Sequence, residues 1–291
     1  MASETELGAF IESYIREYLE APEHNNLGPG TKGKAWVDVL LGFSHGADPL
    51  FGELKEHAGP QHWTPAEAFA LAEISDDPVA ADELTVVSWA LCQSDEAKRS
   101  NRREQRYPSE TWARARMFGQ QCNDSLHHAL VAALLEAGYL AVAPAFLHEW
   151  SEHESERFYV ISSWSERHIA YVSGLGTFSL AGGLITERGQ AVRFGSVVVK
   201  GRVPATPRSY SGPFDYCLYF SRGICARCVQ RCPVGSVRKE GRDKEPCSIH
   251  LGPAMREYVE SHFDFKGYAC GLCQTGVPCE SRIPGPKDVT D

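Results

Sequence analysis

The stretch CARCVQRCPVGSV, residues 225–237, places three cysteines within eight positions and a proline directly after the last of them. It lies in a segment, between positions 217 and 279, that carries eight of the ten cysteines of this 291-residue chain. The N-terminal sequence MASETELGAF lacks the basic start and apolar run of an export signal, so we expect a reducing, cytoplasmic compartment in which disulfides are rare. These cysteines are therefore expected to bind metal rather than one another.

The spacing of the eight cysteines predicts iron–sulfur clusters. The first group reads Cys-x7-Cys-x2-Cys-x3-Cys-Pro, and the second reads Cys-x22-Cys-x2-Cys-x5-Cys. A cubane cluster takes four thiolates, and in two-cluster ferredoxins the fourth cysteine of each run ligates the other cluster. Two [4Fe-4S] clusters are thus predicted, one held by Cys217, Cys225, Cys228 and Cys279, the other by Cys232, Cys247, Cys270 and Cys273.

The first group departs from the ferredoxin pattern at one position. The first cysteine of that pattern would stand where this chain has Arg222. Cys217, five residues earlier, is predicted to take its place. If Cys217 does not ligate, one cluster would hold three irons or would take a ligand other than cysteine.

Zinc is the alternative metal. The two Cys-x2-Cys pairs, one from each group, could together supply the four thiolates of a structural zinc site. That arrangement leaves Pro233 and the other four cysteines of the segment without a role. The two cysteines outside the segment, Cys92 and Cys122, are expected to be buried thiols, because free cysteine behaves as a small core residue.

Composition and patterning divide the rest of the chain. The net charge of −9 argues against a broad basic surface for nucleic acid, and the apolar runs are too short to span a membrane. Residues 1–80 are expected to form an N-terminal helical cap, with one helix near the start and another from TPAE at 64–67. Predicted strands at 84–92, 158–162 and 192–203 alternate with helices, which predicts an α/β or α+β core over 81–212. Residues 213–291 would form the cluster module.

Three segments resemble a known family. PCSIHLG (246–252) followed by YACGLCQTGVPCESRIP (268–284) resembles the second cluster motif of epoxyqueuosine reductases and their relatives. The segment from Arg167 to Gly201 is similar to the stretch that precedes the clusters in those enzymes. The superfamily also contains the respiratory reductive dehalogenases. The resemblance implies an α+β fold with a nitroreductase-like α/β core that holds base-off cobalamin, and a C-terminal ferredoxin-like module whose two clusters feed electrons to the cobalt.

The resemblance also implies where the cofactor and a proton donor lie. The corrinoid contact would be the loop Ser173, Gly174, Leu175, Gly176 and Thr177. Taken alone, the same loop is typical of a helix C-cap followed by a tight turn. Asp124 stands near the place of the family's catalytic aspartate. Without the resemblance, it is interpreted as a first-turn acid of a helix over 124–137.

These observations predict a cobalamin-dependent iron–sulfur reductase. Its substrate would be a small molecule or a corrinoid, and its partner an external low-potential electron donor such as ferredoxin or flavodoxin. A tRNA substrate is unlikely, because the chain ends at Asp291 without the helical-repeat tail of the tRNA-acting enzymes and is acidic. One alternative is an electron-transfer or corrinoid-handling iron–sulfur protein without its own substrate, and another is a flavin-using reductase.

Two polar segments have simpler interpretations. His45, His57 and His62 lie among turn residues without regular spacing, and they are expected to be loop histidines rather than metal ligands. The run KRSNRREQR, residues 98–106, is expected to be a solvated loop, with a phosphate clamp as the alternative.

Overall fold

A four-stranded antiparallel sheet forms the centre of the molecule. We describe it from a computed structural model, which describes residues 4–156 and 158–289. The strand order is β1 (Trp36–His45), β2 (Leu84–Gln93), β8 (Val192–Lys200) and β3 (Ala141–Val142). Trp89 of β2 pairs with Leu41 of β1 on one side and with Gly195 of β8 on the other. All residues of β2 are buried, as its continuous apolar sequence predicts for a strand that is covered on both faces.

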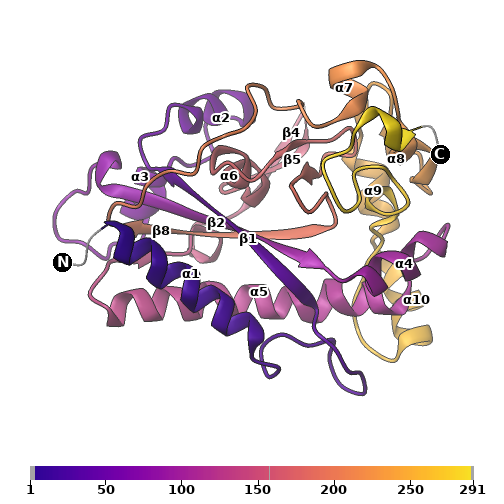
Figure 1. Cartoon of the computed structure of the whole chain (residues 1–291), viewed down its shortest axis with the longest axis horizontal. Coiled ribbons are helices and arrows are strands. Elements are labelled where there is room, and N and C mark those ends of the chain that lie inside the picture. The colour runs from indigo at the N-terminus through magenta and orange to yellow at the C-terminus, as the bar shows by residue number, and fades with distance from the viewer. Residues whose placement is uncertain (1–3, 157, 290–291) are drawn as a thin grey trace.

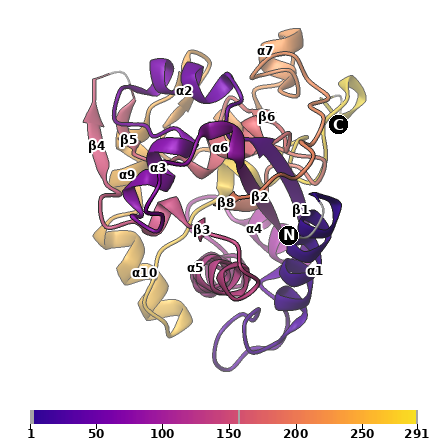
Figure 2. The same ribbon diagram turned by 90° about the vertical axis from the view of Figure 1, so that its left-hand side faces the viewer.

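Helices cover both faces of the sheet. Figure 2 shows α5 (Glu110–Glu136) end-on below it, with α1 (Glu4–Glu20) at its side, and α2 (Leu50–Ala58), α3 (Pro65–Leu71) and α6 (Glu166–Val172) above it. The lower core joins Ile11 and Leu126 to Trp89, because apolar side chains recur at helical spacing in α1 and α5. The upper core joins Phe69 and Ile169 to the opposite face of the sheet.

The cysteine-rich segment lies at one end of the sheet, next to α4 (Asp95–Arg103), as its orange and yellow ribbon shows in Figure 1. Its elements are short: α7 (Leu218–Arg222), α8 (Arg227–Arg231), β9 (Val237–Arg238), β10 (Gly241–Arg242), α9 (Lys244–His250) and α10 (Pro253–Phe263). Two small hairpins, β4 (Glu152–Ser155) with β5 (Tyr159–Ser162) and β6 (Thr177–Phe178) with β7 (Leu184–Ile185), complete the strands. Short 3-10 turns occur at 81–83, 144–146, 272–274 and 286–289. Within the described part of the chain, no helix is long and apolar enough to cross a membrane.

The structure agrees with most expected elements and corrects three. The capping box that starts α3 is present, with Glu67 N donating to Thr64 Oγ1 and Thr64 N donating to Glu67 Oε2. Residues 1–80 are more than a helical cap, because they also contribute β1, an edge strand whose alternating burial produces no long apolar run. The helix expected over 124–137 begins earlier, at Glu110, where the Ser109 side chain caps it. Much of the run 98–106 is helix α4, not a solvated loop, since Asn101 is fully buried.

Candidate metal centre

The first predicted set of four cysteines surrounds one small cavity. Its lining includes all four sulfur-bearing residues, and apolar side chains close the rest of the wall. Burial, together with the neighbouring charges of Cys273, Cys217 and Cys225, raises the pKa of Cys228 to about 12. Burial, followed by the charges of Cys228, Cys217 and Cys225, also raises the pKa of Cys279 well above its ordinary value. The structure therefore brings residues 217, 225, 228 and 279 together, although they lie up to 62 positions apart (279 − 217).

The second predicted set also converges. Burial, together with the charges of Cys273, Cys247 and Cys232, raises the pKa of Cys270 to about 12. Burial raises the pKa of Cys273, the charge of Arg242 opposes this effect, and Cys247 and Cys232 add to it, so that the pKa is about 11. Helix α8 serves both sets, because Cys228 lies within it and Cys232 follows its last residue. The charge of Cys273, from the second set, acts on Cys228 of the first, so the two sets adjoin.

This sorting fits two cubanes better than one zinc ion. The two Cys-x2-Cys pairs fall into different sets, each of which contains four cysteines. Among the described residues, no group of three or more His, Cys, Asp or Glu side chains is placed to hold a metal ion, so the structure shows neither a zinc site nor a formed cluster site. Iron would keep these buried thiols deprotonated, because a bound cation favours the thiolate. The assignment of all eight as cluster ligands stays a prediction.

The loop that carries Cys225 has a strained backbone. Cys225 and Ala226 both have positive φ angles, 88° and 107°, which side chains with a Cβ rarely adopt. Such a conformation costs about 1–3 kcal/mol per residue and persists only where surrounding contacts impose it. Arg222, which occupies the expected ligand position, is exposed at the end of α7, whereas Cys217 is buried before its start. These positions favour Cys217 as the fourth ligand.

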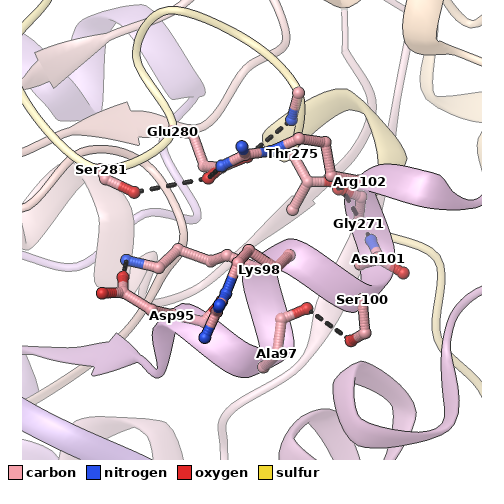
Figure 3. A network of polar contacts seen from close by, with 12 residues as sticks. Asp95, Ala97, Lys98, Ser100, Asn101, Arg102, Gly271, Thr275, Glu280 and Ser281 are labelled. Atoms are coloured by element: carbon pink, nitrogen blue, oxygen red, sulfur yellow. Dashed lines mark hydrogen bonds and ion pairs between the residues drawn. The ribbon is translucent and has the colours of Figure 1, made fainter.

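Helix α4 braces the cysteine-rich segment through the polar network in Figure 3. Asn101 Nδ2 donates to the carbonyl of Cys270 and to Thr275 Oγ1, each at 3.1 Å. Arg102 forms an ion pair with Glu280, whose carboxylate also accepts a hydrogen bond of 2.6 Å from the backbone N–H of Gly276. The network thus ties α4 to the loops that carry the last three cysteines.

Two side chains donate hydrogen bonds to sulfurs of the predicted ligands. Arg242 Nη2 lies 3.2 Å from the sulfur of Cys247, and Gln190 Nε2 lies 3.3 Å from that of Cys279. Hydrogen bonds to the sulfurs are among the factors that set the potential of an iron–sulfur cluster. Sequence analysis missed both residues. Gln190 lies far from Cys279 along the chain, and Arg242 belongs to no recognisable ligand motif, so no local sequence pattern marks either of them.

The glycine loop at 173–177 is part of the interior. The N–H of Leu175 bonds to the carbonyl of Ala170 and the N–H of Gly174 to that of Tyr171, which is a Schellman motif at the end of α6. Gly174 has the positive φ of 84° that this motif requires. Thr177 Oγ1 accepts a hydrogen bond from the N–H of Tyr216, so the loop also positions the chain before Cys217. This packing accounts for Gly174 without a cofactor, and the contact of residues 173–177 with a corrinoid stays a prediction.

Asp124 lies in the middle of α5, so its interpretation as a first-turn acid was wrong. Its carboxylate accepts a hydrogen bond from Gln120 one turn earlier. It also acts electrostatically on Arg193 of β8. Its role as a proton donor is untested, but its position places a carboxylate beside a cationic group between α5 and the sheet.

Comparisons with known proteins identify the fold. No protein-family model matches the chain, and no curated protein matches it. Among solved structures, a selenomethionine-labelled epoxyqueuosine reductase has 15% identity and a TM-score of 0.51, over 99% of this chain and 71% of that one. A reductive dehalogenase whose structure is described as suggesting a mechanism for B12-dependent dehalogenation has 15% identity and a TM-score of 0.52, over 86% of this chain and 31% of that one. The predicted resemblance is confirmed at the level of fold: this chain has the fold shared by epoxyqueuosine reductases and reductive dehalogenases.

Proposed function

We propose that this protein is a reductase whose segment 213–291 is a ferredoxin-like module with two [4Fe-4S] clusters. The clusters would pass electrons to a corrinoid that reduces a small molecule. The observation that carries the proposal is the sorting of eight cysteines, distant in sequence, into two adjoining sets of four. The fold supports it, because the solved structures that share this fold are reductases.

The residues present fit both groups. Two sets of buried and partly buried thiols suit cubane clusters, which supply one-electron storage at potentials tuned by charge and hydrogen bonding. A corrinoid carries many amide groups, and it would supply the reductive chemistry. Among the described residues, Gln120 Oε1 and Arg242 Nε are buried without a hydrogen-bond partner, as is expected of groups that serve a polar ligand.

The chain's own side chains would bind and orient the ligands. Cys217, with the other three cysteines of its set, would hold one cluster, and α4 would keep the ligand loops in place through Asn101 and Glu280. Asp124 would be the proton donor that the reduction needs, because the resemblance places the family's catalytic aspartate near this position. An external ferredoxin or flavodoxin would supply the electrons. The acidic net charge of −9 favours a small-molecule substrate over tRNA.

Anaerobic reconstitution with iron and sulfide tests the clusters. The wild-type protein should take up about eight irons, as two cubanes require. Cys217→Ala should lose between one iron and a whole cluster, that is about one to four irons. Cys92→Ala is the matched control, because Cys92 is equally buried (5% exposed, against 7% for Cys217) but lies outside both sets. Zinc after anaerobic purification, or an unchanged iron content in Cys217→Ala, would contradict the assignment.

Titration with cob(II)alamin, followed by electron paramagnetic resonance, tests the corrinoid. A signal of base-off cobalt in the loaded wild-type protein is expected. If the protein holds eight irons and the cobalt spectrum stays that of free cobalamin, the second candidate function replaces the first. That candidate is an iron–sulfur electron carrier, and it is favoured by the packing of the loop at 173–177 against the protein itself, in which every residue except Gly174 is buried.

A further inference from the structure

An arginine without a partner lies at the end of the central sheet. Arg193 is the second residue of β8 and pairs with Leu91 of β2. Its side chain belongs to the face of the sheet that α5 covers, because Gly195 and Val197, which share its register, pack on that side. Among residues 4–156 and 158–289, the side chain of Arg193 forms no hydrogen bond and no ion pair. The residue is only partly buried, so the five donors of its guanidinium remain accessible to a ligand.

Other cations surround it. Burial, together with the positive charges of Arg116 on α5 and of Arg167 on α6, lowers the pKa of Arg193 to about 9. Arg116 donates a hydrogen bond of 3.0 Å to the hydroxyl of Tyr268, and Arg167 donates one of 2.7 Å to the carbonyl of Gly182. Within the described residues, neither arginine forms an ion pair with a carboxylate. Asp124 is the carboxylate that acts on Arg193, so positive charge is in excess here.

Such an arrangement is unfavourable without a ligand. Like charges repel more strongly inside a protein than in water, and a partly buried charge without a partner loses hydration. Arginine is also the residue best suited to hold a planar or tetrahedral oxyanion, because its fork donates two parallel hydrogen bonds. The missing component is therefore an anion.

We propose that Arg193 and Arg116 bind an oxyanion group, a carboxylate or a phosphate, on a ligand held between α5 and the cysteine-rich segment. Tyr268 connects the site to that segment, because it accepts a hydrogen bond from Arg116 and lies two residues before Cys270. The charge of Asp124 acts on the same group, so a ligand anchored there would lie near the proposed proton donor. The identity of the ligand as a reductase substrate rests on the proposed function, whereas the anion site does not.

Two sources could supply the oxyanion. One is the substrate, and the other is the phosphodiester in the nucleotide tail of cobalamin. Cobinamide has the same macrocycle without that phosphodiester. A comparison of the two corrinoids therefore separates the sources.

The first experiment measures binding of benzoate, phenyl phosphate and the neutral analogue benzamide to the full chain, by calorimetry and by thermal shift. Benzoate or phenyl phosphate should bind the wild-type protein at least tenfold more tightly than benzamide does. Arg193→Gln should weaken the binding of these anions at least tenfold, and Arg193→Lys should weaken it less. Arg202→Gln is the control, because Arg202 is an exposed arginine in an ion pair with Asp82 outside the site. It should bind like the wild type.

The second experiment compares cobalamin with cobinamide in the wild type and in Arg193→Gln. A loss of affinity for cobalamin alone would support the site and identify the cofactor as the source of the oxyanion. If Arg193→Gln changes neither the binding of the small anions nor the preference between the two corrinoids, the proposal is wrong. It is also wrong if benzamide binds as tightly as benzoate.

Iron content and the cobalt spectrum are measured on the same preparations. Anion binding that depends on Arg193, in a protein without iron or bound cobalt, would support the anion site and contradict the reductase. Eight irons and a base-off cobalt signal, without any effect of Arg193→Gln, would support the reductase and contradict the anion site.

Discussion

Glu280 offers the sharpest test of how the cysteine-rich segment is held. Glu280 directly follows Cys279 in the sequence, and its side chain is only 5% exposed. It accepts a hydrogen bond of 2.6 Å from the backbone N–H of Gly276. It also accepts hydrogen bonds from Arg102, one of them from Nε at 3.3 Å (Figure 3). Glu280→Ala removes all of these acceptors at once.

The expected loss of stability follows from these contacts. The N–H of Gly276 would be left without its partner, which costs about 1–3 kcal/mol for a buried group. The ion pair adds less, about 0.5–1 kcal/mol, because the Arg102 side chain is 53% exposed and solvent screens it. Together these effects predict that Glu280→Ala lowers the free energy of unfolding by about 1.5–4 kcal/mol.

Urea denaturation of the wild type and the variant measures this difference, and the rate of iron loss to a chelator measures its effect on the adjoining ligand. Glu280→Gln, which can still accept from Gly276, should lose about half as much stability. Glu20→Ala is the control, since Glu20 is 79% exposed in its pair with Lys34 and should change stability by less than about 0.5 kcal/mol. If Glu280→Ala and Glu20→Ala behave alike, the bracing role of the network is refuted.

Two further predictions concern the core. Burial lowers the pKa of His62 from its ordinary 6.5 to about 4. Below pH 6.5 the unfolded chain therefore binds a proton that the folded protein does not, and the free energy of unfolding falls as the pH drops toward 4, by about 3 kcal/mol at most. His62→Phe should remove that part of the pH dependence of the urea midpoint, and an unchanged slope would contradict this. Gly176→Ala should destabilise the protein by about 1–3 kcal/mol, because a Cβ would lie 2.0 Å from the carbonyl oxygen of Ile185. Gly52→Ala, in α2 with open space around it, should stabilise by about 0.5–1 kcal/mol, and thermal unfolding that gives both variants the same sign would refute the packing argument.

Local patterns were enough for the elements whose signals lie within a few residues. The apolar run at 84–92 predicts β2, and the Thr64–Glu67 pair predicts the start of α3. The edge strand β1 was missed, because an edge strand alternates between buried and exposed residues and this one contains Asp38 and Gly42. The start of α5 was also missed, since the polar residues of its first half are held by tertiary contacts such as those of Arg114.

The sequence by itself determined the identity of the eight candidate ligands and their division into two sets of four, because thiol spacing and a following proline carry that information locally. Only the tertiary structure decided what surrounds them. Asn101 and Glu280 take part in the network that braces the ligand loops, and the charge of Arg116 acts on Arg193 although 77 positions separate them (193 − 116). The reason is physical: a ligand motif is a short-range arrangement of one residue type, whereas bracing contacts and an excess of buried charge arise when distant segments pack together.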